Sequence, residues 1–448
     1  MRPRKPDPTP QADMFRESLA AILDPRHELL RLAARIDWDR LDALYGATFV
    51  ERVGRPGLPT RLMVGLHLIK HIKGVSDEAV CAAWVENPYF QAFCGETHFQ
   101  HRLPADRSSM TNWRKRMDAD KLEALLAETI SIAMASGAVS ERQLERVTVD
   151  TTVQTKAVAH PTDSHLMLRA IEWLNRAARA NGVRLRQSYL RVARRARKEA
   201  ARLMHGRGHR QARAHLRFMR TRLGRLIRDI ERRIDGDPAR MSALATVLER
   251  ARTIHGQKPG DTQKLYAFHA PEVECIGKGK ARTRYEFGAK ASFATTNERC
   301  KGGQFVLGAM SLPGNPYDGH TLGAQLDQVA RVTGKKPARA YVDRGYRGHG
   351  LNRDGLEVHV SHTRGITSPT IRRELRRRNG IEPVIGHMKQ DGLLERNPLK
   401  GIEGDVINVM LCAIGHNLRL LLAWFRKLLW LILAAILFSA TAARPRVA

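Results

Sequence analysis

Three acidic residues stand at positions where they can do chemistry together. Asp150 and Asp343 each lie at the end of a short β-branched run, residues 146–153 and 338–343. Such runs predict buried strands, and the ends of neighbouring strands in one sheet bring distant residues together. The third acid, Glu382, precedes Pro383, and proline suits the first turn of a helix. A carboxylate in that turn is favoured by the helix dipole.

Converging carboxylates repel one another, and a divalent cation relieves this repulsion. Mg²⁺ and Mn²⁺ prefer oxygen ligands. Two such ions about 3.5–4 Å apart can activate a water and stabilise a leaving oxygen in phosphodiester chemistry. Taken singly, each acid is equally explained as a turn former or a cap. The trio, in a basic protein, favours metal binding by Asp150, Asp343 and Glu382.

Basic residues flank the third acid at helical spacing. Lys389 follows Glu382 by seven positions, two turns of a helix, so both can face the same way. Arg378 stands one turn before Glu382, although Gly380 and Pro383 predict that a new helix begins between them. The sequence therefore predicts a carboxylate flanked by two cations in this segment.

The surrounding pattern predicts a mixed α/β sheet. Further strand-like runs cover residues 284–295, 304–312 and 356–361, and residues 320–332 have helical spacing. Helical character returns at 371 and 382. Strands mixed with helices in this order indicate an α/β domain.

An arginine-rich segment interrupts this pattern after the first strand. Residues 165–255 hold 24 Arg or Lys against 7 Asp or Glu, with apolar residues at roughly helical spacing. Arginine keeps its charge and can bond phosphate bidentately. The segment predicts a helical insertion that binds phosphate through Arg194, Arg195 and Arg197. A charged helical face paired with acidic neighbours is the alternative.

The N-terminal region predicts short helices joined by tight turns, over residues 62–72, 78–85 and 110–117. This arrangement suits a helix-turn-helix-like DNA-binding unit whose last helix presents Arg114 and Lys115. It equally suits a small helical bundle with a solvated basic face.

Composition restricts the class of protein. The 448 residues carry a formal charge of +31, which favours a polyanionic partner, and 43% are hydrophobic, which excludes a wholly disordered chain. Five scattered cysteines exclude a disulfide scaffold and indicate a reducing compartment. The apolar segment 418–438 contains Arg419, Arg426 and Lys427, and predicts a buried or partner-packed helix rather than membrane contact.

In combination these motifs resemble bacterial insertion-sequence transposases of the DDE type, from the family conventionally numbered five. Asp150, Asp343 and Glu382 match the three acids of that class. Arg378, Glu382 and Lys389 match the last three members of its tyrosine, arginine, glutamate, lysine signature, and Leu375 stands in place of the tyrosine. The segments 54–117, 315–322 and 343–348 also resemble the family, and the similarity extends from about residue 15 to 430.

The resemblance implies a ribonuclease-H-like core at 141–160 and 262–415. It would be accompanied by a helical N-terminal DNA-binding or dimerisation domain at 1–140, a basic helical insertion at 161–261 and an apolar C-terminal helix and tail at 416–448. The implied activity is transposition with two Mg²⁺ or Mn²⁺ ions. The enzyme would bind terminal inverted repeats of double-stranded DNA, cleave them and join the 3′-hydroxyl ends to target DNA.

Further expectations concern partners and alternatives. His320 either contacts DNA or caps a helix, and Arg344 is a further candidate DNA contact. The resemblance implies a dimer or larger homo-oligomer, located in the bacterial cytoplasm on the nucleoid. Two alternatives remain open: a ribonuclease-H-like nuclease that cuts without joining, and a domesticated DNA-binding protein without catalysis.

Overall fold

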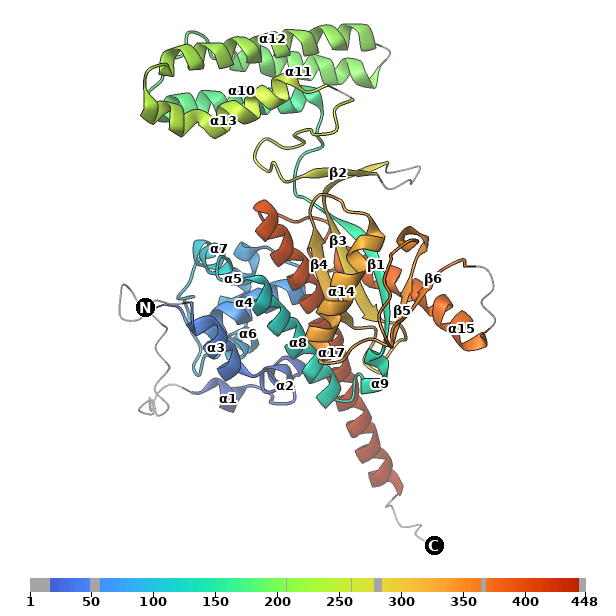
Figure 1. Ribbon diagram of the computed structural model, residues 1–448. Coiled ribbons are helices and arrows are strands. Elements are labelled where there is room, and N and C mark those ends of the chain that lie inside the picture. Colours follow the sequence, from blue (N-terminus) through green and yellow to red (C-terminus); the bar gives the residue numbers. More distant parts are fainter. Residues whose placement is uncertain are drawn as a thin grey trace. The chain divides into compact units, whose positions relative to one another are not determined.

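The structure is a computed structural model that describes residues 17–48, 57–206, 208–258, 260–277, 284–363 and 368–442, with side chains up to residue 429. The first 16 residues of the predicted N-terminal domain therefore lie outside it. The chain divides into two compact units (Figure 1). Unit 1 comprises residues 1–155 and 289–448, and unit 2 comprises residues 156–288.

Within the residues that the structure describes, unit 1 begins with nine helices. Side chains cap them where the sequence predicts breaks: Ser76 accepts a hydrogen bond from the first turn of α5, and Asp106 forms a capping box with Ser109 at the start of α7. The helices are α1 (Leu19–Ile22), α2 (Glu28–Ala33), α3 (Trp38–Gly46), α4 (Thr60–Lys73), α5 (Asp77–Glu86), α6 (Pro88–Phe93), α7 (Arg107–Arg114), α8 (Ala119–Ala135) and α9 (Glu141–Leu144).

A mixed sheet follows, in the order β2-β3-β1-β5-β6, in which β2 is Glu274–Gly277 and β4 also pairs with β3. β5 is parallel to β1 and to β6, whereas β4 is antiparallel to β3. Hydrogen bonds join Asn297 to Arg146 and Lys156 to Phe287, so β3 runs antiparallel to β1. The strands are β1 (Arg146–Thr155), β3 (Tyr285–Thr296), β4 (Val306–Leu312), β5 (Arg339–Val342) and β6 (Glu357–Val360).

Helices pack on this sheet. α14 contacts β4 and β1, and α17 contacts β4 (Figure 1). α16 contacts β1. Two 3-10 turns complete the unit: η1 follows β5, and η2 separates α15 from α16. The elements are α14 (Asp318–Thr333), η1 (Arg344–Tyr346), α15 (Pro369–Arg377), η2 (Arg378–Gly380), α16 (Ile381–Gln390) and α17 (Gly401–Ala442).

The long helix α17 joins the N-terminal helices to the sheet. It packs against α4, α8 and β4, and one continuous hydrophobic core includes residues from all four elements. Asn417, fully buried, bonds both to the β4 backbone at Val306 and to Thr129 of α8. The predicted domain boundaries at 140 and 416 therefore do not separate compact units. The N-terminal helices, the sheet and α17 share one core.

α17 also accounts for the apolar C-terminal segment. Among the described residues it is long and apolar enough to cross a membrane by length and composition, over Gly401–Leu429. However, 78% of its most apolar window is buried inside the protein. That burial is what the core helix of a globular unit shows.

Unit 2 contains a four-helix bundle with its own core, which includes Leu174, Leu223 and Leu248. The predicted insertion, 161–261, falls within this unit. Beyond the bundle, β2 (Glu274–Gly277) pairs antiparallel with residues 285–288 of β3, and Lys156 forms a buried ion pair with Glu272 at 2.9 Å. The bundle helices are α10 (Asp163–Ala180), α11 (Leu190–His205), α12 (His209–Ile234) and α13 (Pro238–Gly256).

Candidate active site

The sheet register places the first two predicted acids opposite each other. Thr148 of β1 is the partner of Tyr341 on β5, and two residues further along each strand come Asp150 and Asp343. Residues two apart on a strand lie on the same face. The two aspartates are thus neighbours across the β1–β5 pair. Asp150 lies in the middle of β1, and not at its end as the sequence predicted, because the strand continues to Thr155, whereas Asp343 directly follows β5.

Their proximity alters the protonation of Asp150, whose side chain is 18% exposed. Burial, followed by the negative charge of Asp343, raises the pKa of Asp150 to about 6. The backbone N–H of Thr151 donates to the Asp150 carboxylate at 2.8 Å, which partly opposes the shift. Asp343 accepts from the backbone N–H of Gly345 at 2.8 Å, and so caps the η1 turn.

A third aspartate, Asp318, belongs to the same group. It begins α14, and its carboxylate accepts from the Thr151 hydroxyl at 3.1 Å and pairs with Lys290 of β3 at 2.6 Å. A β-carbon added at Gly345 would lie 3.0 Å from the carboxylate oxygens of both Asp318 and Asp343. Asp318 is not among the site residues that the sequence predicts, although segment 315–322, which carries it, resembles the family.

Tyr346 is a buried neighbour of these three aspartates. Its side chain is fully buried, and burial raises its pKa well above the usual value. The negative charges of Asp150, Asp318 and Asp343 raise that pKa further, so all three carboxylates lie near the phenol. Two cations oppose this negative charge: Lys290 pairs with Asp318, and Arg378 lies beside Asp150.

The segment carrying the third predicted acid packs beside β1. Arg378, in η2, reaches Asp150 at 3.8 Å with its side chain 12% exposed. Glu382 is exposed in the first turn of α16, and Lys389 is half-buried in the last. The α-helix is interrupted between Arg378 and Glu382, as the glycine and proline predict. The 3-10 turn η2 separates α15 from α16 there.

Buried contacts hold α15 to the sheet. The carboxylate of Glu374, 1% exposed, bonds to the hydroxyl of Tyr341 and pairs with Arg146 at 3.4 Å and with Arg339 at 3.5 Å. Its backbone carbonyl accepts from Asn297 at 3.0 Å. One turn after Glu374 the chain reaches Arg378, so these contacts position the arginine that faces Asp150.

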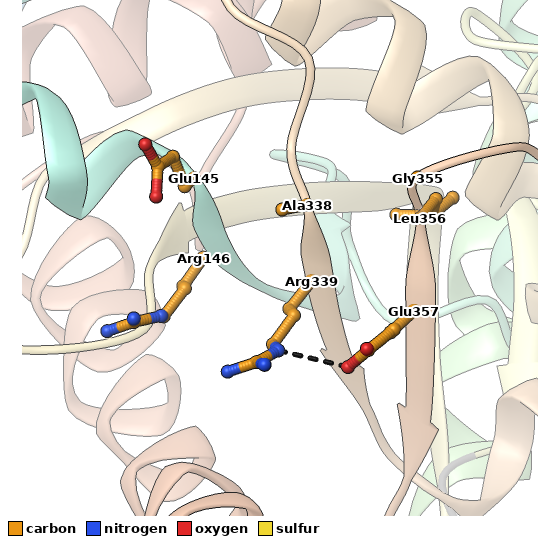
Figure 2. Close-up of a pocket in the computed structure, with 7 residues that line it drawn as sticks. All are labelled: Glu145, Arg146, Ala338, Arg339, Gly355, Leu356 and Glu357. Carbon is orange, nitrogen blue, oxygen red and sulfur yellow. Dashed lines mark hydrogen bonds and ion pairs between the residues drawn. The ribbon is translucent and has the colours of Figure 1, made fainter.

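A pocket of about 440 Å³ lies at the opposite ends of the strands. It is lined by the first residues of β1, β5 and β6 and their predecessors, and Figure 2 shows Arg339 paired with Glu357 there. Arg146 and Arg339 point to the same side of the pocket (Figure 2). Because Asp150 and Asp343 come four residues later on each strand, this pocket is not the site of the acids.

Asp150 and Asp343 fit a hard divalent cation. They offer neighbouring oxygen ligands, and burial followed by the charge of Asp343 raises the pKa of Asp150. Mg²⁺ is commonly held by one or two carboxylates, with water and substrate phosphate completing its shell. No group of three or more His, Cys, Asp or Glu in the described part of the chain is arranged to hold a metal. Repulsion among carboxylates opposes such a cluster until a cation joins them.

The structure differs from expectation at Arg114. This arginine is 7% exposed and forms a two-bond ion pair with Asp77, at 3.0 and 2.6 Å. Lys70, also buried, pairs with the same carboxylate at 2.7 Å. A guanidinium engaged in this way supports the fold and is not presented to DNA. Lys115, the next residue, is exposed.

The other predicted DNA contacts are mostly accessible. His320 is exposed near the start of α14, with its ring 5.4 Å from that of Tyr317, and Arg344 is exposed in η1 beside Asp343. In the bundle, the predicted contacts differ: Arg194 pairs with Glu172 at 3.2 Å, Arg195 is exposed and Arg197 is half-buried.

Comparison with known proteins gives the family. Residues 17–116 match the family described as "Transposase domain (DUF772)", and residues 253–418 match the one described as "Transposase DDE domain". A Rhizobium meliloti protein, "Uncharacterized protein ORF8 in nfe locus", is 51% identical over 207 residues, which are 46% of this chain and 99% of that protein. No solved structure matches the chain. Together with the paired aspartates, these matches show that the chain belongs to the DDE transposases of insertion sequences.

Proposed function

We propose that the protein binds the terminal inverted repeats of its own element, cleaves them and joins the resulting 3′-hydroxyl ends to target DNA. The observation that carries this proposal is the pairing of Asp150 with Asp343 across two parallel strands, with Arg378 beside them. Assignment to the family numbered five rests on the spacing of Arg378, Glu382 and Lys389.

The sheet supports a ribonuclease-H-like core. Its order, β2-β3-β1-β5-β6 with β4 also paired to β3, combines antiparallel pairs at β3 with parallel β1, β5 and β6. The first acid lies on β1, the first strand along the chain, and the second directly follows β5. This arrangement supports the assignment of both acids to the site.

The acids would hold the divalent ions, Mg²⁺ or Mn²⁺, through Asp150 and Asp343, with Glu382 completing the set. When bound, such ions lower the pKa of a bound water and stabilise the charge on the leaving oxygen. Arg378 and Lys389 would hold the phosphates on either side of the cut, and Arg344 and His320 would contact nearby DNA. A dimer or larger assembly on paired ends, within the bacterial cytoplasm, completes the proposal.

Cleavage and strand transfer on DNA carrying the terminal repeats test the proposal. Asp150→Ala, Asp343→Ala and Glu382→Ala should each abolish cleavage in Mg²⁺ and leave binding of the ends largely intact. Asp354→Ala, at an exposed aspartate, is the matched control and should cleave normally. Cleavage without joining would instead support the nuclease, and binding without cleavage by the wild type the non-catalytic DNA-binding protein.

A further inference from the structure

The longest helix of unit 2, α12, carries arginines along the side opposite its buried residues. At about 100° per residue, positions 210, 217 and 228 point within about 20° of one another, and 213 and 225 flank them within about 60°. Met219, Leu223 and Ile230, on the other side, are fully buried in the bundle core. We call the following exposed set the arginine row: Arg210, Arg213, Arg217, Arg225 and Arg228.

No acid neutralises the arginine row. The sequence from 209 to 228 contains no Asp or Glu. The next two acids on the helix are engaged elsewhere: Asp229 with Arg233 at 3.1 Å and Glu231 with Arg252 at 2.6 Å. None of the five guanidinium groups forms an ion pair or a side-chain hydrogen bond with a residue that the structure describes. Their charges are thus available to an external partner.

The spacing of the row suits an extended polyanion. With a rise of 1.5 Å per residue, Arg210 and Arg228 are separated by about 27 Å along the helix. Over that length each strand of duplex DNA presents about eight phosphates, at 3.4 Å per nucleotide. The planar guanidinium bonds phosphate with two parallel N–H groups and keeps its charge at any physiological pH.

The surroundings favour DNA over a protein or a membrane. None of the exposed large hydrophobic side chains in the described ranges lies on α12. A protein interface is centred on apolar and aromatic side chains, and a membrane-surface helix inserts an apolar face. The apolar face of α12 is already buried in the bundle.

We propose that the arginine row of α12 is a sequence-independent binding surface for the backbone of duplex DNA. This inference rests on the proposed function and deepens it, because it locates the non-specific DNA contact of unit 2 on one face of one helix. The row holds the duplex through phosphates alone, so it can engage the element or the target whatever their sequence.

The test measures the salt dependence of binding by the full-length protein to a labelled duplex that lacks the terminal repeat. Each phosphate neutralised contributes about 0.9 to the slope of log K against log salt. The triple variant Arg210→Ala, Arg217→Ala, Arg228→Ala should therefore reduce the slope by about 2.7. Replacing the same three residues by lysine should preserve most of the slope, because the charges remain.

The control variant removes the same charge from arginines that are paired with acids. Arg202, Arg240 and Arg252 pair with Glu199, Asp237 and Glu231, and all three are exposed. Their replacement by alanine should leave the slope nearly unchanged. An equal loss in both alanine variants would overturn the proposal, because total charge alone would then explain binding.

Two further outcomes would also overturn it. One is an unchanged slope in the triple alanine variant. The other is a loss confined to binding of anionic phospholipid vesicles, which would assign the row to a membrane. Cleavage of terminal-repeat DNA is measured in parallel. Normal cleavage with an unchanged slope refutes the arginine row alone, whereas a reduced slope with no cleavage by the wild type refutes the proposed chemistry alone.

Discussion

Replacing Asp150 by asparagine should stabilise the metal-free protein, and the gain should depend on pH. The pKa of Asp150 is raised from 3.8 to about 6 by burial and by the charge of Asp343. An acid whose pKa is raised on folding contributes its full stability below its unfolded pKa, and that contribution is lost as pH rises through the folded pKa. A shift of this size corresponds to about 3 kcal/mol. Asparagine cannot ionise and keeps an oxygen to accept from Thr151.

The assay is urea unfolding in EDTA between pH 4 and pH 8.5, for the wild type, Asp150→Asn and the exposed control Asp354→Asn. The advantage of Asp150→Asn in free energy of unfolding should be near zero at pH 4, grow through pH 6 and level off near 3 kcal/mol by pH 8. Added Mg²⁺ at pH 8 should stabilise the wild type more than the variant. A difference between wild type and Asp150→Asn that does not change with pH would refute this reasoning.

Other predictions concern the supports of the site and of the N-terminal helices. Asp77→Ala leaves Lys70 and Arg114 as unpaired buried cations, and should lower the free energy of unfolding by about 3–5 kcal/mol in urea titrations. Gly345→Ala places a methyl group 3.0 Å from two carboxylate oxygens, and should reduce cleavage roughly tenfold with little change in melting temperature; unchanged cleavage would show that the acids can move aside. Glu374→Gln should weaken the anchoring of α15, costing about 2 kcal/mol in stability. Binding of DNA ends should persist while cleavage falls, and loss of both together would indicate a merely structural role.

Local patterns predicted the strands that carry the first two acids, because β-branched runs at 146–153 and 338–343 became β1 and β5. The register of the parallel β1–β5 pair then places Asp150 opposite Asp343. Asp318 could not be identified in this way. An aspartate after proline and tyrosine is an ordinary turn residue, and its approach to Asp343 depends on how α14 packs on the sheet.

The N-terminal helices illustrate a different limit. Their positions follow from caps and apolar spacing, but the partner of Arg114 does not. Asp77 lies 37 residues earlier, and only the packing of α7 beside α5 brings the two together. The sequence of α7 therefore predicts a basic helix that can contact DNA, whereas in the structure its Arg114 is buried and paired with Asp77. Similarly, apolar spacing cannot show that α17 fills the space between α4, α8 and β4.

The chain leaves the sheet at the end of β1 and returns along β3, and these strands are antiparallel neighbours. Unit 2 therefore occupies the place of a hairpin loop. A hairpin imposes few demands on what joins its strands beyond bringing their ends together, and sheet pairing continues whatever the length of the connection. Relatives can thus gain, lose or exchange this module without altering the register that pairs Asp150 with Asp343. The DNA contact proposed for unit 2 and the chemistry proposed for the acids therefore belong to parts of the chain that can change independently.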